Sequence, residues 1–387
     1  MNFTRIAKKI TGKKLASAVT AAALTAVLAA GAITASGSEG LSRTIAGTGS
    51  HGAADGSSAQ FNLPGGVLGG SGGSIYVIDT YNNLIRRIDA GGSVRTMTGA
   101  VTATGDFGFP RGFHRDGAAS EALFSRPASG VLCPRGRMYI ADSANHSIRV
   151  ITGGNVYTFA GGEAGHADGR VAEAQFNRPS AIARGSCGSL YIADALNHAV
   201  RRIDPAGNVT TVAGTPGVSG YADGAGDEAQ FNGPMGIAVS PDGAVFVADT
   251  GNHLIRVIED GRVRTLAGTL VFPADTDMNG DGNGYGDDFY IDDEPLGGFA
   301  DGEADAIFNL PMGLALHGET LIVADSANHR IRAVSPDGEV TTLAGTGYPD
   351  YSAGAFHTPR GVYVRGNELI IADSGNNMIR ALPLSGS

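Results

Sequence analysis

One phrase of eight residues occurs six times in the chain and limits its fold more than any other feature. Each copy reads Asp, two variable residues, Asn, His or Asn, one variable residue, an aliphatic residue and Arg. Successive copies are separated by 63, 52, 55, 76 and 48 residues. Repeats of this length are typical of propellers and solenoids. The repeated positions are Asp79, Asp142, Asp194, Asp249, Asp325 and Asp373, with Arg86, Arg149, Arg201, Arg256, Arg332 and Arg380 seven residues further on.

Each repeat contains the same series of short β-rich segments. In the fourth repeat these are 209–213, 236–239, 244–248 and 254–258, joined by turns rich in Gly, Asp and Asn. Four such segments predict one four-stranded antiparallel sheet per repeat. No stretch after residue 35 shows a helical period of useful length, which excludes folds that alternate strands with helices.

The two ends of the repeat array predict how it closes. Residues 42–46 match the outermost strand of a repeat, yet no inner strands precede them, and the last repeat stops soon after its third strand at Arg380. We expect 42–46 to complete the last sheet, because closure removes unpaired strand edges. The prediction is an all-β, six-bladed β-propeller of four-stranded antiparallel blades over 41–387, with the last blade closed by the N-terminal strand.

The repeated phrase resembles the NHL repeat, which is named for an Asn-His-Leu triplet. The triplet is intact at Asn252-His253-Leu254, while Asn83 and Asn377 replace the His in two repeats. The resemblance covers essentially all of 41–387 and implies the propeller fold, but the family has many functions. Because the Asp and Arg recur in every repeat, we expect structural roles for them. The Asp would accept N–H groups of the turn, and the Arg would return to the Asp or pair with the next blade.

Residues 1–35 are expected to form a signal peptide. Five cationic residues, all at or before Lys14, precede the uncharged stretch 15–35, which ends in small residues around Ala32 and Ala35. This arrangement is typical of export signals, and an uncleaved membrane anchor is the alternative. We therefore expect a secreted or cell-envelope protein with no membrane insertion once the signal is cleaved.

The charge of the chain after residue 35 argues against nucleic-acid binding. The 23 remaining basic residues, all Arg, stand against 38 acidic ones, a net charge of −15. A protein that binds the phosphate backbone needs the opposite balance. The absence of Lys from this part of the sequence also excludes a Schiff-base lysine and a P-loop lysine there.

An insertion at 269–299 accounts for the longest spacing between repeats and resembles EF-hand and dockerin-type calcium loops. Counted from Asp277, oxygen-bearing side chains fall at loop positions 1, 3 and 5, Gly282 falls at 6 and a carboxylate at 12. This spacing lets a loop wrap a hard cation, although no helix flanks it. The alternative is an acidic, Gly-rich linker. The predicted calcium ligands are Asp277, Asn279, Asp281, Asn283 and Asp288.

The two cysteines, Cys133 and Cys187, lie near the first-to-second-strand turns of adjacent repeats. In an exported protein they could form a disulfide, but their separation cannot be judged from sequence.

For function, the sequence favours a non-catalytic scaffold that binds a protein, peptide or glycan, is stabilised by calcium and is expected to be monomeric. Divergent loops at 101–114, 269–299 and 348–355 carry the aromatic residues that suit such partners: Phe107, Phe109, Phe289, Tyr290, Tyr348 and Tyr351. The alternative is a lactonase or lyase with a metal in the central channel, as in propeller enzymes that this chain resembles. The predicted inner strands contain almost no ionisable residue to hold that metal.

Overall fold

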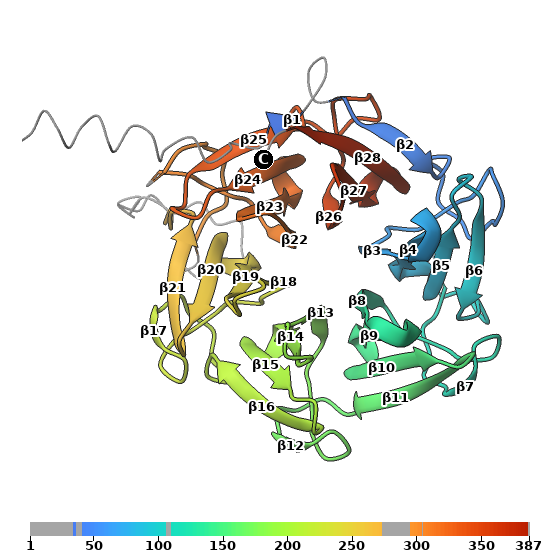
Figure 1. Ribbon diagram of the computed structural model, residues 1–387, viewed down its shortest axis with the longest axis horizontal. Helices are drawn as coiled ribbons and strands as arrows, with labels where there is room; N and C mark the ends of the chain where they lie inside the picture. The colour runs from blue at the N-terminus through green and yellow to red at the C-terminus, as the bar shows by residue number, and fades with distance from the viewer. Residues whose placement is uncertain (1–33, 36–40, 106–109, 273–294, 304, 386–387) are drawn as a thin grey trace, which may run out of the picture.

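The computed structural model describes residues 34–35, 41–105, 110–272, 295–303 and 305–385, and it is a ring of six antiparallel sheets. Figure 1 shows the six blades around a central axis, with the first strand of each blade nearest the centre. The predicted six-bladed propeller is confirmed. The helices among the described residues are short 3-10 turns, and none of them is long and apolar enough to cross a membrane.

The strands of each blade follow one another from the centre outward. Blade 1 contains β3 (Gly66–Gly69), β4 (Ile75–Asp79), β5 (Leu84–Ile88) and β6 (Val94–Thr98). Blade 2 contains β8 (Pro127–Leu132), β9 (Met138–Asp142), β10 (Ser147–Thr152) and β11 (Asn155–Gly161). Blade 3 contains β13 (Pro179–Arg184), β14 (Leu190–Asp194), β15 (Ala199–Ile203) and β16 (Asn208–Ala213). Blade 4 contains β18 (Gly236–Val239), β19 (Val245–Asp249), β20 (Leu254–Glu259) and β21 (Arg262–Ala267). Blade 5 contains β22 (Pro311–His317), β23 (Thr320–Asp325), β24 (Arg330–Val334) and β25 (Val340–Ala344).

Blade 6 is built from both ends of the chain. It contains β26 (Pro359–Arg365), β27 (Glu368–Asp373) and β28 (Met378–Ser385), and its outer strand is β2 (Arg43–Ala46). β2 runs antiparallel to β28, with Thr44 opposite Arg380 and Ala46 opposite Ile379. The predicted closure is therefore confirmed. The two residues of β1 (Thr34–Ala35) pair with the end of β28, while the rest of the predicted signal peptide lies outside the described residues.

The blades contain more strands than the sequence predicted. Blades 2, 3 and 4 each gain a two-residue fifth strand on the outer edge: β7 (Gly117–Ala118), β12 (Gly169–Arg170) and β17 (Gly224–Ala225). These strands belong to the Asp-Gly loops, which run back along the outer strand before they enter the blade, as Gly224 does opposite Val263. Two residues are too few to show an alternating pattern, so the sequence reads as a loop there.

Each repeated Asp ends the second strand of a blade and is followed by one 3-10 turn. The residue after each turn, His or Asn, has a left-handed conformation, with φ between 51° and 59°. The turns are η3 (Thr80–Asn82), η5 (Ser143–Asn145), η6 (Ala195–Asn197), η7 (Thr250–Asn252), η8 (Ser326–Asn328) and η9 (Ser374–Asn376). Two further turns, η2 (Ser71–Gly73) and η4 (Pro134–Gly136), join first to second strands.

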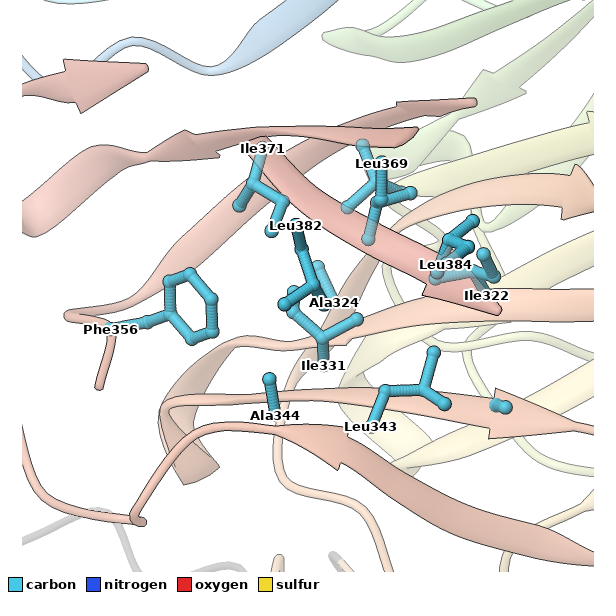
Figure 2. Close-up of a cluster of buried hydrophobic side chains, with 12 residues drawn as sticks. Ile322, Ala324, Ile331, Leu343, Ala344, Phe356, Leu369, Ile371, Leu382 and Leu384 are labelled. Carbon is cyan, nitrogen blue, oxygen red and sulfur yellow. The ribbon is translucent and has the colours of Figure 1, made fainter. Parts of the chain in front are cut away.

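The hydrophobic core is divided among the interfaces between blades. Figure 2 shows the cluster between blades 5 and 6, where Ile331 and Leu343 lie opposite Ile371 and Leu382, with the buried ring of Phe356 at one side. The closing interface is built in the same way, since Ala46 and Ile379 of blade 6 pack with Phe61 and Val77 of blade 1. Burying such side chains stabilises each interface by about 1.5–3 kcal/mol per large residue.

Candidate functional site

The repeated Asp is the centre of a buried hydrogen-bond hub in every blade. In blade 4, Asp249 Oδ1 accepts the backbone N–H of Asn232 at 2.7 Å. Its Oδ2 accepts Asn252 Nδ2 and Arg256 Nη1, both at 2.8 Å. The Asn thereby ties the turn to the second strand, and the Arg ties the third strand to it. Both carboxylate oxygens are used within the fold.

The repeated Arg is fully enclosed and joins the hub to the loop that leads into the blade. Arg256 Nη2 donates to Asp223 Oδ1 at 2.6 Å, and its guanidinium lies over the ring of Phe231 at 5.2 Å. Asp223 is about half exposed and also accepts the N–H of Thr265 at 3.0 Å. Each Arg therefore returns to the Asp of its own blade, and not to the next blade. The outer partners in the other blades are Asp55, Asp116, Asp168 and Asp301.

The hub carboxylates are held in place as anions. Burial raises the pKa of Asp249 to about 6, while the charge of Arg256 and three hydrogen bonds keep it from rising further. Burial likewise raises the pKa of Asp79 and Asp194 to about 6, against the opposing effect of their hydrogen bonds and of the paired Arg. These groups are ionised at neutral pH, paired and sealed from solvent, so the hub supports structure and offers no free group for catalysis.

The His or Asn after each turn joins its blade to the next one. His253 Nδ1 accepts the backbone N–H of Leu310 at 3.0 Å, and His329 Nδ1 accepts that of Thr358 at 3.0 Å. Asn377 Oδ1 does the same for Leu63 at 2.9 Å, across the closing interface. An Asn can replace a His here because both supply one acceptor. The remaining three bonds link Asn83 to Arg126, His146 to Arg178 and His198 to Gly233.

One face of the ring, which we call the turn face, carries the six turns and the loops that lead into the inner strands. The turn Asn residues fix these loops to it: Asn376 Nδ2 donates to Asp350 O at 2.7 Å, and Asn252 Nδ2 donates to Gly220 O at 2.8 Å. Tyr348 and Tyr351 are 77% and 62% exposed in the last of these loops. Phe107, Phe109, Phe289 and Tyr290 lie outside the described residues.

The central channel is lined by the six inner strands and has a volume of about 470 Å³. Its walls are mainly glycine and aliphatic side chains, because the inner strands approach one another closely: a Cβ at Gly236 would overlap the Met312 carbonyl oxygen. Among the described residues that line it, the charged ones are Arg184 and Arg360, and there is no acidic residue or His. The described part of the chain also has no group of three His, Cys, Asp or Glu placed to hold a metal ion.

Arg360 lies at the entrance of the channel on the turn face. It directly follows Pro359, a position that the other blades fill with Gly65, Ala128, Ser180, Met235 and Met312. Its side chain is half-buried, and within the described structure it forms no hydrogen bond or ion pair. Burial lowers the pKa of Arg360; the nearby Tyr81 hydroxyl opposes this shift and the positive charge of Arg126 adds to it. The Arg126 guanidinium lies 3.6 Å from the centre of the Tyr81 ring beside this entrance.

Of the other predicted site residues, the structure describes the two cysteines. All five predicted calcium ligands, Asp277, Asn279, Asp281, Asn283 and Asp288, lie outside the described residues. Cys133 and Cys187 are both free thiols, so the structure does not contain the disulfide considered from the sequence. Cys187 is exposed and its Sγ lies 3.2 Å from Ser189 Oγ, whereas Cys133 is partly buried against the core between blades 2 and 3.

Sequence reasoning missed two features of this face. The bonds between blades were missed because their donors are backbone N–H groups, which leave no residue signal. Arg360 was missed although a signal existed: aligned on the repeated Pro, five repeats have an uncharged residue at this position and one has Arg.

The comparisons with known proteins agree with this architecture. The family model of the NHL repeat matches residues 231–258, which enclose the hub of blade 4. The protein SUPPRESSOR OF QUENCHING 1 of Arabidopsis thaliana is 32% identical over 210 residues, covering 50% of this chain and 18% of that protein. NHL repeat-containing protein 2 of Bos taurus is 31% identical over 173 residues, covering 41% of this chain and 23% of that protein. The matches thus span less than a quarter of these relatives.

Solved structures share the fold at low sequence identity. An auxiliary nutrient binding protein from Bacteroides ovatus has a TM-score of 0.60 and 14% identity, with 90% of this chain and 77% of that chain covered. A gluconolactonase from Xanthomonas campestris has a TM-score of 0.55 and 14% identity, with 92% and 98% covered. Similarity at this level concerns the fold alone. The matched family model, the relatives and the six copies of one turn and hub together support membership of the NHL-repeat family.

Proposed function

We propose that this propeller is an exported, non-catalytic binding module whose turn face takes a protein, peptide or glycan. The observation that carries the proposal is that the repeated polar groups and the exposed aromatic groups have different locations. The repeated carboxylates are consumed in buried hubs, whereas the turn face presents exposed aromatic side chains on loops that the turn Asn residues fix in place. Aromatic side chains on rigid loops are well suited to recognition, because little conformational entropy is lost on binding.

The alternative is a lactonase or lyase that uses a metal in the channel, and the folds of known propeller enzymes favour it. The channel residues do not fit such a metal. Protein ligands for catalytic metals are His, Cys, Asp and Glu, and the described lining offers glycine, aliphatic residues, hydroxyls and two Arg.

A binding screen tests the proposal directly. The purified chain would be probed against glycan and peptide arrays, and each hit measured again with the double variant Tyr348→Ala/Tyr351→Ala. We expect a loss of affinity of roughly tenfold or more, as for aromatic residues that dominate an interface. Tyr157→Ala is the control, since Tyr157 is 47% exposed but lies on the outer strand β11. Hydrolysis or elimination of lactone or lyase substrates by the wild-type chain would favour the enzyme instead.

Calcium binding and export are further parts of this proposal, supported by the spacing in 277–288 and by the character of 1–35. A bound ion that stabilises the native state raises the melting temperature. We expect EDTA to lower Tm by a few degrees in the wild type and to leave Tm unchanged in Asp277→Ala/Asp281→Ala. An equal Tm with and without EDTA in the wild type would remove calcium from the proposal. Analysis of the mature N-terminus in cell fractions tests export.

A further inference from the structure

The channel and its entrance have a charge opposite to that of the molecule. The chain carries a formal net charge of −10, yet the described residues lining the channel include Arg184 and Arg360 and no carboxylate. The six buried hub Arg residues, by contrast, each contact at least one Asp. A partly buried Arg without an ion-pair partner beside an apolar cavity destabilises the folded state, unless a bound anion pairs with it.

The environment of Arg360 suits an anion of a particular shape. Its Nε is buried without a hydrogen-bond partner, and Arg126 adds a second positive charge beside it. Arg presents a planar fork of donors, which matches a carboxylate. Directly behind Arg360 the channel wall consists of Gly361, Val362 and the matching residues of the other blades. Ser129 is the one polar residue among these, so the rest of a ligand would meet a mainly apolar wall there.

We propose that the channel entrance binds a carboxylate attached to an apolar body, with the carboxylate on Arg360 and the apolar body inside the channel. The inference deepens the proposed binding function by naming the chemistry of one contact at the centre of the turn face. Two sources share this chemistry: a free aliphatic acid and the C-terminus of a peptide that ends in an apolar residue. The cavity of about 470 Å³ is large enough for a chain of several methylenes or one apolar side chain.

Calorimetric titration of the full chain tests the site with defined probes. Butanoate, hexanoate and octanoate measure the apolar part, octan-1-ol lacks the charge, and an N-acetylated tetrapeptide ending in Leu is used as free acid and as amide. Along the series from butanoate to octanoate, we expect the affinity to rise roughly three- to fourfold with each added methylene. Octan-1-ol is expected to bind much more weakly than octanoate, because it lacks the charge. Tight binding of the peptide acid, but not of its amide, would identify the peptide as the source.

The matched variants are Arg360→Gln and Arg365→Gln. Both change an Arg of blade 6, but Arg365 pairs with Glu368 at 2.9 Å and does not line the channel. We expect Arg360→Gln to weaken carboxylate binding by roughly tenfold or more and Arg365→Gln to change it less than twofold. Because Arg360 has no partner within the described fold, its replacement should leave Tm unchanged.

The outcomes separate this inference from the proposed function. If array ligands bind the turn face with equal affinity in wild type and Arg360→Gln, and neither carboxylate series binds, the channel site is wrong and the binding module stands. If the carboxylates bind but Tyr348→Ala/Tyr351→Ala leaves the binding of every array ligand unchanged, the channel site stands. In that case the proposed recognition by the exposed tyrosines of the turn face is wrong.

Discussion

Blades 4 and 6 contain the same repeated residues, but only blade 4 is made from one continuous stretch of chain. In blade 4 the buried Arg256 contacts two carboxylates, Asp249 at 2.8 Å and Asp223 at 2.6 Å. In blade 6 Arg380 lies 3.3 Å from Asp373 and forms no second ion pair with a carboxylate among the described residues. Its Nη2 donates instead to the carbonyl oxygens of Ser352 at 2.9 Å and Ser42 at 3.5 Å.

This difference shows where the repeat was altered to close the ring. Ala353 occupies the place of Asp223, and its carbonyl oxygen accepts the N–H of Ser42 at 2.8 Å just before β2 begins. A main-chain contact with the other end of the chain has therefore replaced an ion pair. The same blade carries Arg360, so this blade holds both the closure and the proposed ligand contact.

The largest effect should come from removing the inner carboxylate of each hub. Asp373→Ala leaves Arg380 buried with no carboxylate, whereas Asp249→Ala leaves Arg256 paired with Asp223. Loss of one partner from a buried pair costs about 3–5 kcal/mol, and we expect the upper end for Asp373→Ala and the lower end for Asp249→Ala. Urea denaturation measures both. An equal or larger loss in blade 4 would contradict the comparison.

The next effect concerns the close approach of the inner strands. A Cβ at Gly236 would overlap the Met312 carbonyl oxygen, while one at Gly361 would lie 2.7 Å from the Gly65 carbonyl oxygen. Overpacking costs about 1–3 kcal/mol, so Gly236→Ala should lie near the top of this range and Gly361→Ala near the bottom. Thermal unfolding of the two variants provides the ranking. The opposite ranking would mean that the closing interface is the more rigid one.

A substitution that restores the repeat should stabilise blade 6. In Ala353→Asp the new carboxylate would face Arg380 and the N–H of Thr44, as Asp223 faces Arg256 and Thr265 in blade 4. Because the group would be partly exposed, the gain should be at most about 1 kcal/mol. Asp223→Ala is the matched loss. If Ala353→Asp lowers the free energy of unfolding, the contact with Ser42 needs the present backbone and cannot accommodate the ion pair.

The smallest effect is a pH dependence of the bonds between blades. Burial lowers the pKa of His329, with added repulsion from His357 and Arg330, and burial lowers the pKa of His146. The folded state therefore binds fewer protons than the unfolded state. Its stability falls as the pH drops through the unfolded value of about 6.5 toward the depressed pKa of the folded state. Loss of one acceptor costs about 1 kcal/mol or less.

His329→Asn isolates this effect, because Asn377 and Asn83 make the same bond without titrating. The measurement is the difference in unfolding free energy between wild type and variant at pH 7.5 and pH 5. The comparison with the variant is needed because burial raises the pKa of the hub Asp residues. Their titration makes the folded state more stable as the pH falls over part of this range, which opposes the effect of the His residues. A pH response that is the same in both proteins would assign it to other groups.

More of the fold than of the candidate site could be predicted from the sequence. The number of blades, the strand order and the closing strand follow from one phrase and from the match between 42–46 and the outer strands, and the structure agrees. The Asp and Arg of the phrase were expected to be structural, and they lie in the hubs. The entrance to the channel was not anticipated, because Arg360 occurs once and belongs to no motif.

The sequence by itself determined a closed ring of six sheets, because strand alternation and turn residues act locally and were repeated six times. Only the tertiary structure decided what joins the blades and what faces the channel. His253 meets a backbone N–H 57 residues away, and Asn377 meets one 314 residues away. Likewise, Arg360 has an apolar cavity beside it only because six separate strands converge there. Such contacts depend on the path of the whole chain, which no local pattern encodes.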